Sequence, residues 1–285
     1  MHGSRFRISR RSMTLVAALA GVVSLAIGAH AALNKRALDA AKAITTEQDS
    51  GSTGHHSRIA LIIGNGHYPD ASAPLAQPIN DARALTVALR HNGFDVDVVE
   101  DARKDDLARA VARLKSRIRP DSVVMLFFGG YGVQVGRESY MIPVDAAIWK
   151  ESDVRRDGVS IESVLDVMKE RGARAKLVVV DASRRNPYER RFRAFSHGLA
   201  PINPPDNALI LSSATPGRVA DDSTDRHSVL MAELLHNLDP QTGVETSFKQ
   251  TRAAIARASE GEQVPAVTSS LVEDVRFGPT DNAGS

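Results

Sequence analysis

The sequence predicts an α/β fold, with an open, doubly wound, mostly parallel sheet of about six strands between two layers of helices. Continuous apolar runs separated by amphipathic stretches indicate this class, because strands buried on both faces need no polar alternation. The alternation of strands and helices also requires right-handed crossovers. The continuous apolar runs span residues 59–63, 123–128, 177–180 and 208–211.

Further elements follow from the periodicity of apolar residues. Residues 95–99 alternate Asp and Val, which is typical of a strand with one wet face, so we expect it near the sheet edge beside the first strand. The predicted helices repeat apolar residues every third or fourth position and end at a stop signal. One runs from Asp81 to Asn92-Gly93 and one from Leu107 to the residues before Pro120, followed by residues 161–169, 227–238 and 248–258.

The first 31 residues are interpreted as a secretory signal peptide. Four arginines precede an apolar run at residues 13–28, and Ala29-His30-Ala31 follows as a cleavage site. An uncleaved anchor is the alternative, because a membrane helix needs roughly 17 to 25 apolar residues. Either interpretation predicts an exported chain, periplasmic or extracellular, and only the anchor involves a membrane.

One domain is expected after the signal segment. Residues 32–57 are rich in Ala, Ser, Thr and Gly and are predicted to be a flexible tether. The domain itself is predicted over residues 58–279, and residues 280–285 form a short tail.

Composition limits the possible partners and chemistry. The chain has 36 Lys and Arg against 34 Asp and Glu, and the signal segment holds four of the arginines and no acid, which leaves 32 against 34. We therefore expect no nucleic-acid partner. The absence of cysteine excludes disulfides, thiolate metal sites and a cysteine nucleophile. No cofactor and no metal is expected.

Three segments that follow predicted strands are candidates for the functional site, because ligands bind at the carboxyl ends of strands in such sheets. The first contains Gly64, Gly66 and His67, but it lacks the third glycine of a dinucleotide fingerprint. The others are residues 129–132, Gly-Gly-Tyr-Gly, and residues 181–183, Asp-Ala-Ser.

These segments resemble the bacterial caspase-like and metacaspase peptidases. The resemblance covers about residues 58–278 and implies the three-layer caspase-like α/β/α sandwich. In that family the second segment reads Gly-His-Gly and the third reads Asp-Ala-Cys, so the two catalytic positions hold Tyr131 and Ser183 here. The matching motifs are residues 62–65, Leu75, residues 78–82, 127–132, 181–187 and 215–217, Val219, Ala220 and Asp222.

Both replacements remove chemistry that the family reaction uses. A cysteine attacks as a thiolate, whereas a serine hydroxyl must give its proton to a base. A tyrosine with a pKa near 10 is protonated at neutral pH and accepts a proton poorly. His67 is a candidate for a recruited base, with a solvated loop histidine as the alternative, and His197 and His227 are interpreted as polar surface residues.

Binding features are expected to outlast the catalytic dyad. By resemblance, the N–H groups of Gly132 and Ser183 form an oxyanion hole. The resemblance also makes Asp181, with Asp222 as a second acid, a receptor for a basic side chain of a peptide. The alternatives are a capping carboxylate for Asp181 and a solvated acidic turn for Asp222.

Two functions follow from the sequence. The first is an exported, catalytically inactive pseudopeptidase that binds a peptide or protein partner. The second is an active endopeptidase that cuts after Arg or Lys, with Ser183 as nucleophile and a recruited base. An arginine cluster at residues 184–193 is interpreted as a solvated loop, with docking to an acidic partner or membrane surface as the alternative.

Overall fold

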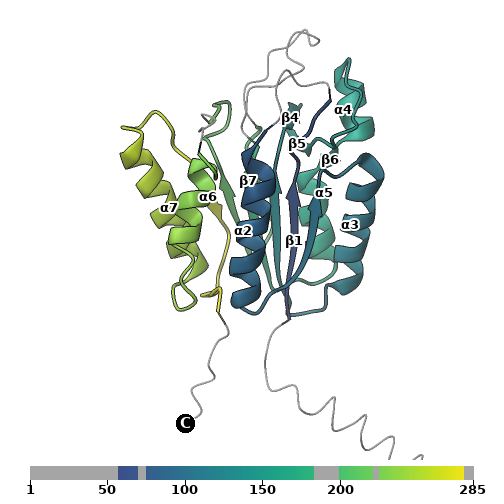
Figure 1. Ribbon diagram of the computed structural model, residues 1–285. Coiled ribbons are helices and arrows are strands. Elements are labelled where there is room, and N and C mark those ends of the chain that lie inside the picture. Colours follow the sequence, from purple (N-terminus) through teal and green to yellow (C-terminus); the bar gives the residue numbers. More distant parts are fainter. Residues whose placement is uncertain (1–56, 70–74, 183–198, 221–224, 279–285) are drawn as a thin grey trace, which may run out of the picture. The chain divides into compact units, whose positions relative to one another are not determined.

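The computed structural model describes residues 57–69, 75–182, 199–220 and 225–278. At the centre of this part lies a six-stranded sheet in the order β2-β1-β3-β7-β8-β9 (Figure 1). The pairs are parallel except for the outermost, in which β9 runs antiparallel to β8. The predicted α/β class and mostly parallel sheet are therefore confirmed. The strands are β1 (Arg58–Gly64), β2 (Asp95–Glu100), β3 (Val123–Gly129), β7 (Ala175–Asp181), β8 (Ala208–Ser212) and β9 (Ala266–Ser269).

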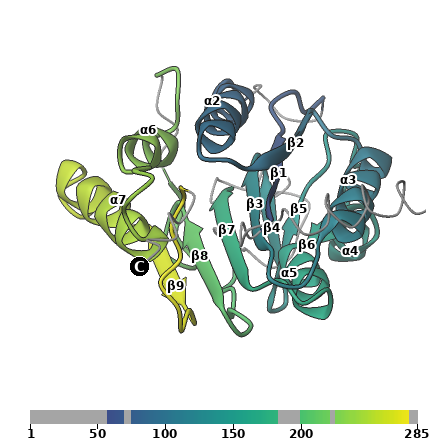
Figure 2. The same ribbon diagram turned by 90° about the horizontal axis from the view of Figure 1, so that it is seen from below.

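Helices cover both faces of the sheet, and Figure 2 shows the two layers end-on. Side chains of each central strand alternate between two apolar cores, as in β3, where Leu126 and Phe128 enter one core and Met125 and Phe127 the other. The first core lies under α3 (Lys104–Arg117) and α5 (Ile161–Glu170), and the second under α2 (Gln77–His91), α6 (Val229–His236) and α7 (Val244–Ala258).

Two predictions about individual elements can be compared with the structure. Strand β2 is the edge strand beside β1, as its alternating sequence predicted. Helix α2 begins at Gln77 and not at Asp81, because Pro78 is compatible with the first turn of a helix. Asp81 consequently lies inside the helix, where its side chain is buried.

A second, three-stranded sheet was not predicted from the sequence. It consists of β4 (Gly132–Val135), β5 (Glu138–Met141) and β6 (Val159–Ser160), with α4 (Glu151–Asp157) inserted before β6. Its strands have only two to four residues, too few for a periodic pattern. A separate apolar cluster supports it, in which Tyr68, Val133, Val135, Ile142 and Val154 are buried.

The predicted signal segment, the C-terminal tail and nearly all of the predicted tether lie outside the described residues. Within the described ranges, no helix is long and apolar enough to cross a membrane. The domain boundaries and the export of the chain remain predictions.

Candidate functional site

The three candidate segments converge at the carboxyl edge of the main sheet. The last residues of β1, β3 and β7 lie in register, with Gly64 beside Gly129 and Gly129 beside Asp181. The segments leaving these strands stay adjacent, because Asn65 N–H donates to Gly129 O at 2.8 Å and Gly130 N–H to Asp181 O at 3.3 Å. The structure thus brings the Gly-Gly-Tyr-Gly turn against the Asp181-Ala182 end of β7. Ser183, His197 and Asp222 lie outside the described residues.

Tyr131 is built into the packing of this edge. Its backbone N–H donates to the hydroxyl of Tyr68 at 3.0 Å, and that hydroxyl donates to Ile142 O at 3.0 Å. The two rings pack edge to face with centroids 4.8 Å apart. Gly130 completes the arrangement, because its φ is +157° and a Cβ there would lie 2.6 Å from the Tyr68 hydroxyl. Tyr131 is therefore held in place by both backbone and ring contacts.

Gly132 lies directly against Ala182, the residue before Ser183. A Cβ added to Gly132 would come within 2.9 Å of the Ala182 Cβ and 2.7 Å of Leu199 Cδ2. Ile142 N–H donates to Tyr131 O, so these two residues form a hydrogen-bonded antiparallel pair. Such pairs alternate with non-hydrogen-bonded pairs, and the next pair is Gly132 with Met141. In a non-hydrogen-bonded pair the N–H groups point away from the partner strand. The Gly132 N–H is accordingly not used by β5, as an oxyanion donor requires.

Asp181 is buried at the end of β7, on the face that carries Leu177 and Val179 toward α2. The structure places a second acid near it, Asp81 of α2, which was predicted from the sequence as a helix start and as part of the motif at residues 78–82, but not as a site residue. Burial, and then the nearby Asp181 carboxylate, raise the pKa of Asp81 to about 6, although hydrogen bonds from His227 and Ser228 act in the opposite direction. The signal that could have found Asp81 was its position within the Pro78–Ala82 motif.

His227 supplies the side-chain hydrogen bond to Asp81. Its Nδ1 lies 2.8 Å from Asp81 Oδ1, and Ser228 N–H points at the same carboxylate at 3.3 and 3.4 Å. The His227 side chain is 25% exposed and that of Asp81 is 1% exposed. The expectation of an ordinary surface histidine is thus wrong for His227, because a buried carboxylate binds its ring.

His67 is oriented by a different carboxylate. Its Nδ1 lies 2.6 Å from Asp101 Oδ2, while Asp101 Oδ1 accepts the N–H groups of Gly66 and His67. Partial burial acts to raise the pKa of Asp101, but these hydrogen bonds lower it. Asp101 directly follows β2, three strand spacings or about 14 Å from the end of β7. The His67 ring is consequently drawn toward the edge of the sheet opposite to β7.

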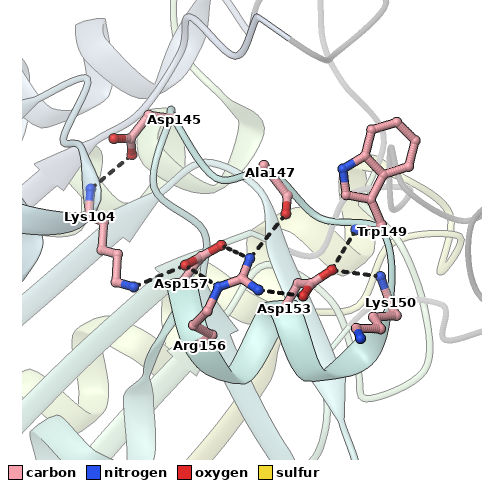
Figure 3. Close-up of polar contacts among 8 residues, drawn as sticks. All are labelled: Lys104, Asp145, Ala147, Trp149, Lys150, Asp153, Arg156 and Asp157. Carbon is pink, nitrogen blue, oxygen red and sulfur yellow. Dashed lines mark hydrogen bonds and ion pairs between the residues drawn. The ribbon is translucent and has the colours of Figure 1, made fainter.

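A polar network fixes the loop between β5 and α4 (Figure 3). Asp153 accepts hydrogen bonds from the N–H groups of Trp149 and Lys150, and Arg156 bridges Asp153 to Asp157. Lys104 of α3 donates its ammonium to Asp157 at 3.0 Å. The network links α4 to α3 and holds the backbone of the loop at Trp149. Trp149 itself is 66% exposed.

In the ranges that the structure describes, no group of three or more His, Asp or Glu side chains is arranged to hold a metal ion. Among the described residues, the polar groups at the carboxyl edge include carboxylates, imidazoles, phenols and backbone N–H groups, supplied by Asp81, Asp101, Asp181, His67, His227, Tyr68 and Tyr131. This set can hold a peptide backbone and a cationic side chain.

Fold and edge together define an α/β sandwich with a candidate binding site at the carboxyl ends of its strands. Residues 57–276 match the profile of the caspase domain, peptidase family C14. The chain therefore belongs to the caspase-domain peptidase family.

Individual relatives agree with this assignment. The human mucosa-associated lymphoid tissue lymphoma translocation protein 1 is 27% identical over 133 residues, which are 46% of this chain and 16% of that protein. Its mouse homologue is 26% identical over 147 residues, 50% of this chain and 17% of that protein. The chain thus matches less than a fifth of the length of these relatives.

A solved structure shows the same fold. Caspase-1 from Spodoptera frugiperda superposes with a TM-score of 0.60 at 18% identity, over 80% of this chain and 92% of that one. The predicted caspase-like architecture is confirmed by this likeness.

Proposed function

We propose that this caspase-family protein is an exported pseudopeptidase that binds a peptide or protein partner at the carboxyl edge of its sheet. The observation that carries the proposal is Tyr131, which stands where relatives have the histidine base. A phenol with a pKa near 10 stays protonated at neutral pH, and loss of a general base typically costs about a hundredfold to ten-thousandfold in rate. The sequence contains no cysteine to serve as a thiolate nucleophile.

Hollows beside β8 support a retained binding role. A cavity of about 170 Å³ is lined by Ile210, Ser212 and Ala214 together with the segment that begins at Leu199. A second of about 300 Å³ lies where Ala214 and Arg218 face Glu262. Ala214 lines both, so the two hollows adjoin the chain that follows β8 and offer recesses for the side chains of a bound peptide.

The rival function is a serine endopeptidase that uses Ser183 and cuts after Arg or Lys. It needs a base within hydrogen-bond reach of the nucleophile. The best candidate, His67, bonds to Asp101 on the β2 side of the edge, which counts against its recruitment.

The decisive experiment measures hydrolysis of a fluorogenic peptide panel with Arg or Lys before the scissile bond. The full-length chain, purified in mild detergent, is compared with Ser183→Ala and with the double variant Ser183→Cys/Tyr131→His. We expect no hydrolysis by the wild type and measurable hydrolysis by the double variant. Hydrolysis by the wild type that disappears in Ser183→Ala would establish the rival function.

Export is tested separately by fractionating the producing cells and sequencing the N-terminus of the recovered protein. We expect the protein outside the cytoplasm, with cleavage after Ala31. Recovery of the intact chain from the cytoplasm would contradict this part of the proposal.

A further inference from the structure

Two buried carboxylates, of Asp81 and Asp181, lie on the α2 side of the carboxyl edge. The Asp81 turn of α2 lies across the strand ends, because a Cβ on Gly64 would lie 2.4 Å from Pro78 O and 2.8 Å from the Ala82 Cβ. Asp181 ends β7 on the same face and is close enough to disfavour the charge on Asp81. Burial and a nearby acid both disfavour the ionised form of a carboxylate, so a cation or a group rich in N–H donors stabilises it strongly.

The imidazole of His227 provides part of this stabilisation to Asp81 from within the chain. It donates to, or shares a proton with, Asp81 Oδ1 at 2.8 Å. The ring is partly exposed whereas the carboxylate is not, so the imidazole lies between Asp81 and solvent.

The backbone around His227 is anchored independently of the imidazole. Asn80 Nδ2 donates to Arg226 O at 3.2 Å, which holds the preceding residue on α2. Ser228 caps α6, because its hydroxyl accepts the Met231 N–H at 3.0 Å. Rotation of the His227 side chain therefore leaves the cap and the start of α6 in place.

We propose that His227 is a displaceable occupant of an acidic subsite, holding the place on Asp81 that the guanidinium or ammonium of a bound peptide's arginine or lysine takes. The inference rests on the proposed peptide-binding function and adds the residue that limits it. A guanidinium presents five N–H donors in a planar fork and carries a fixed charge, whereas the imidazole offers Asp81 one ring nitrogen. A cationic side chain thus gains more from the Asp81 and Asp181 pair than the imidazole loses.

If a cationic ligand displaces His227, it must first break the hydrogen bond between His227 and Asp81, and this cost lowers the affinity of the protein for the ligand. Removing the imidazole should strengthen binding of a cation, whereas a residue that restores the hydrogen bond should not. The amide of asparagine can place an N–H group near the position of His Nδ1, so His227→Asn is the restoring variant. His227→Ala removes the occupant.

The test measures binding of N-acetyl-arginine amide to the full-length chain by titration calorimetry, with the neutral isostere N-acetyl-citrulline amide as the control ligand. Four proteins are compared: wild type, His227→Ala, His227→Asn and His91→Ala, in which an exposed histidine at the far end of α2 is lost. We expect the affinity for the arginine amide to rise about tenfold in His227→Ala, the scale of a hydrogen bond to a charged group. The Asn and His91 variants should match the wild type, and citrulline should not bind.

Each other outcome overturns the inference in a distinct way. Weaker binding by His227→Ala makes the imidazole part of the binding surface. Equal affinity of wild type and His227→Ala shows that no displacement occurs, with the binding function intact. If neither the wild type nor His227→Ala binds the arginine amide, the acidic subsite does not exist. The hydrolysis assay still tests catalysis independently.

A second measurement reads displacement directly in the wild type and uses His227→Ala only to assign a signal. The ring proton shared between His227 Nδ1 and Asp81 should give a downfield NMR signal, assigned by its absence in His227→Ala. We expect saturating N-acetyl-arginine amide to abolish this signal. A signal that persists at saturation contradicts displacement.

Discussion

The hydroxyl of Tyr68 accepts the backbone N–H of Tyr131 at 3.0 Å, so Tyr131 is tied to the loop after β1. The contact joins the ends of two neighbouring strands, β1 and β3, above the sheet. Because Ile142 N–H donates to Tyr131 O, the same residue also anchors the second sheet. Tyr131 thus stabilises the carboxyl edge of the main sheet through its backbone contacts.

Substituting Tyr68 by Phe should destabilise the protein. The Tyr131 N–H loses this acceptor in a half-buried position, which typically costs about 1–3 kcal/mol in the free energy of unfolding. Ile142 O is less affected, because Asn65 Nδ2 also donates to it at 3.1 Å. Denaturant unfolding of the full-length chain measures the loss.

Tyr140→Phe is the matched control. The Tyr140 hydroxyl donates to Glu138, whose side chain is 47% exposed, so water can replace the lost partner. We expect a smaller loss, below about 1 kcal/mol. Equal losses for the two variants would show that the Tyr68–Tyr131 bond has no special weight.

Gly132→Ala should report the close approach of β4 to the end of β7. The new methyl would meet the Ala182 Cβ at 2.9 Å and Leu199 Cδ2 at 2.7 Å, and overpacking of this kind costs about 1–3 kcal/mol. Adding Ala182→Gly removes the Ala182 Cβ, one of the three nearest atoms that the new methyl meets. A double-mutant cycle measured by denaturant unfolding should therefore give a favourable coupling above about 0.5 kcal/mol. Additive effects would contradict the contact.

Stability should depend on pH through Asp81. Burial and the Asp181 charge raise the pKa of Asp81 to about 6, above the value near 3.9 expected in the unfolded chain. The folded state therefore binds this proton more tightly, and the cost of ionisation is absent below about pH 4 and complete above about pH 6. We expect the free energy of unfolding of Asp81→Asn to rise relative to that of the wild type by about 3 kcal/mol as the pH rises through this window.

Unfolding midpoints at pH values on both sides of the window test this expectation. Asp105→Asn is the control, because Asp105 is exposed in the first turn of α3. Its stability should stay parallel to that of the wild type at every pH. A wild type and an Asp81→Asn variant that also stay parallel would mean that Asp81 does not titrate in this range.

Elements with long apolar runs could be predicted from the sequence, and those held by pairing alone could not. Residues 123–128 form a run of six consecutive apolar residues. This length is usual for a buried strand and too short for a typical helix, so the run predicts a strand. β9 has no such run, since its four residues are half-buried or exposed and are defined by antiparallel pairing with β8. The sequence of such a strand does not predict it, because its conformation depends on pairing with a neighbouring strand.

The candidate site shows the same division. Asp181 and Gly132 were predicted because they directly follow or adjoin recognisable strands. The Asp81–His227 pair was missed, since its members are 146 residues apart and no local pattern links His227 to the Pro78–Ala82 motif that contains Asp81. Tertiary folding brings them together through the docking of α6 beside α2.

Asp153→Ala should loosen the loop that carries Trp149, without a matching loss in the main sheet. Asp153 accepts the N–H groups of Trp149 and Lys150, and these bonds help to hold the pKa of Asp153 below its usual value. Trp149 is the one tryptophan of the chain, so fluorescence anisotropy reports on this loop directly. We expect lower anisotropy in Asp153→Ala and an unchanged value in Glu151→Ala, which alters an exposed acid in the same first turn. If both variants retain the wild-type anisotropy, the loop is held by the Arg156 and Lys104 bonds of the network and not by Asp153.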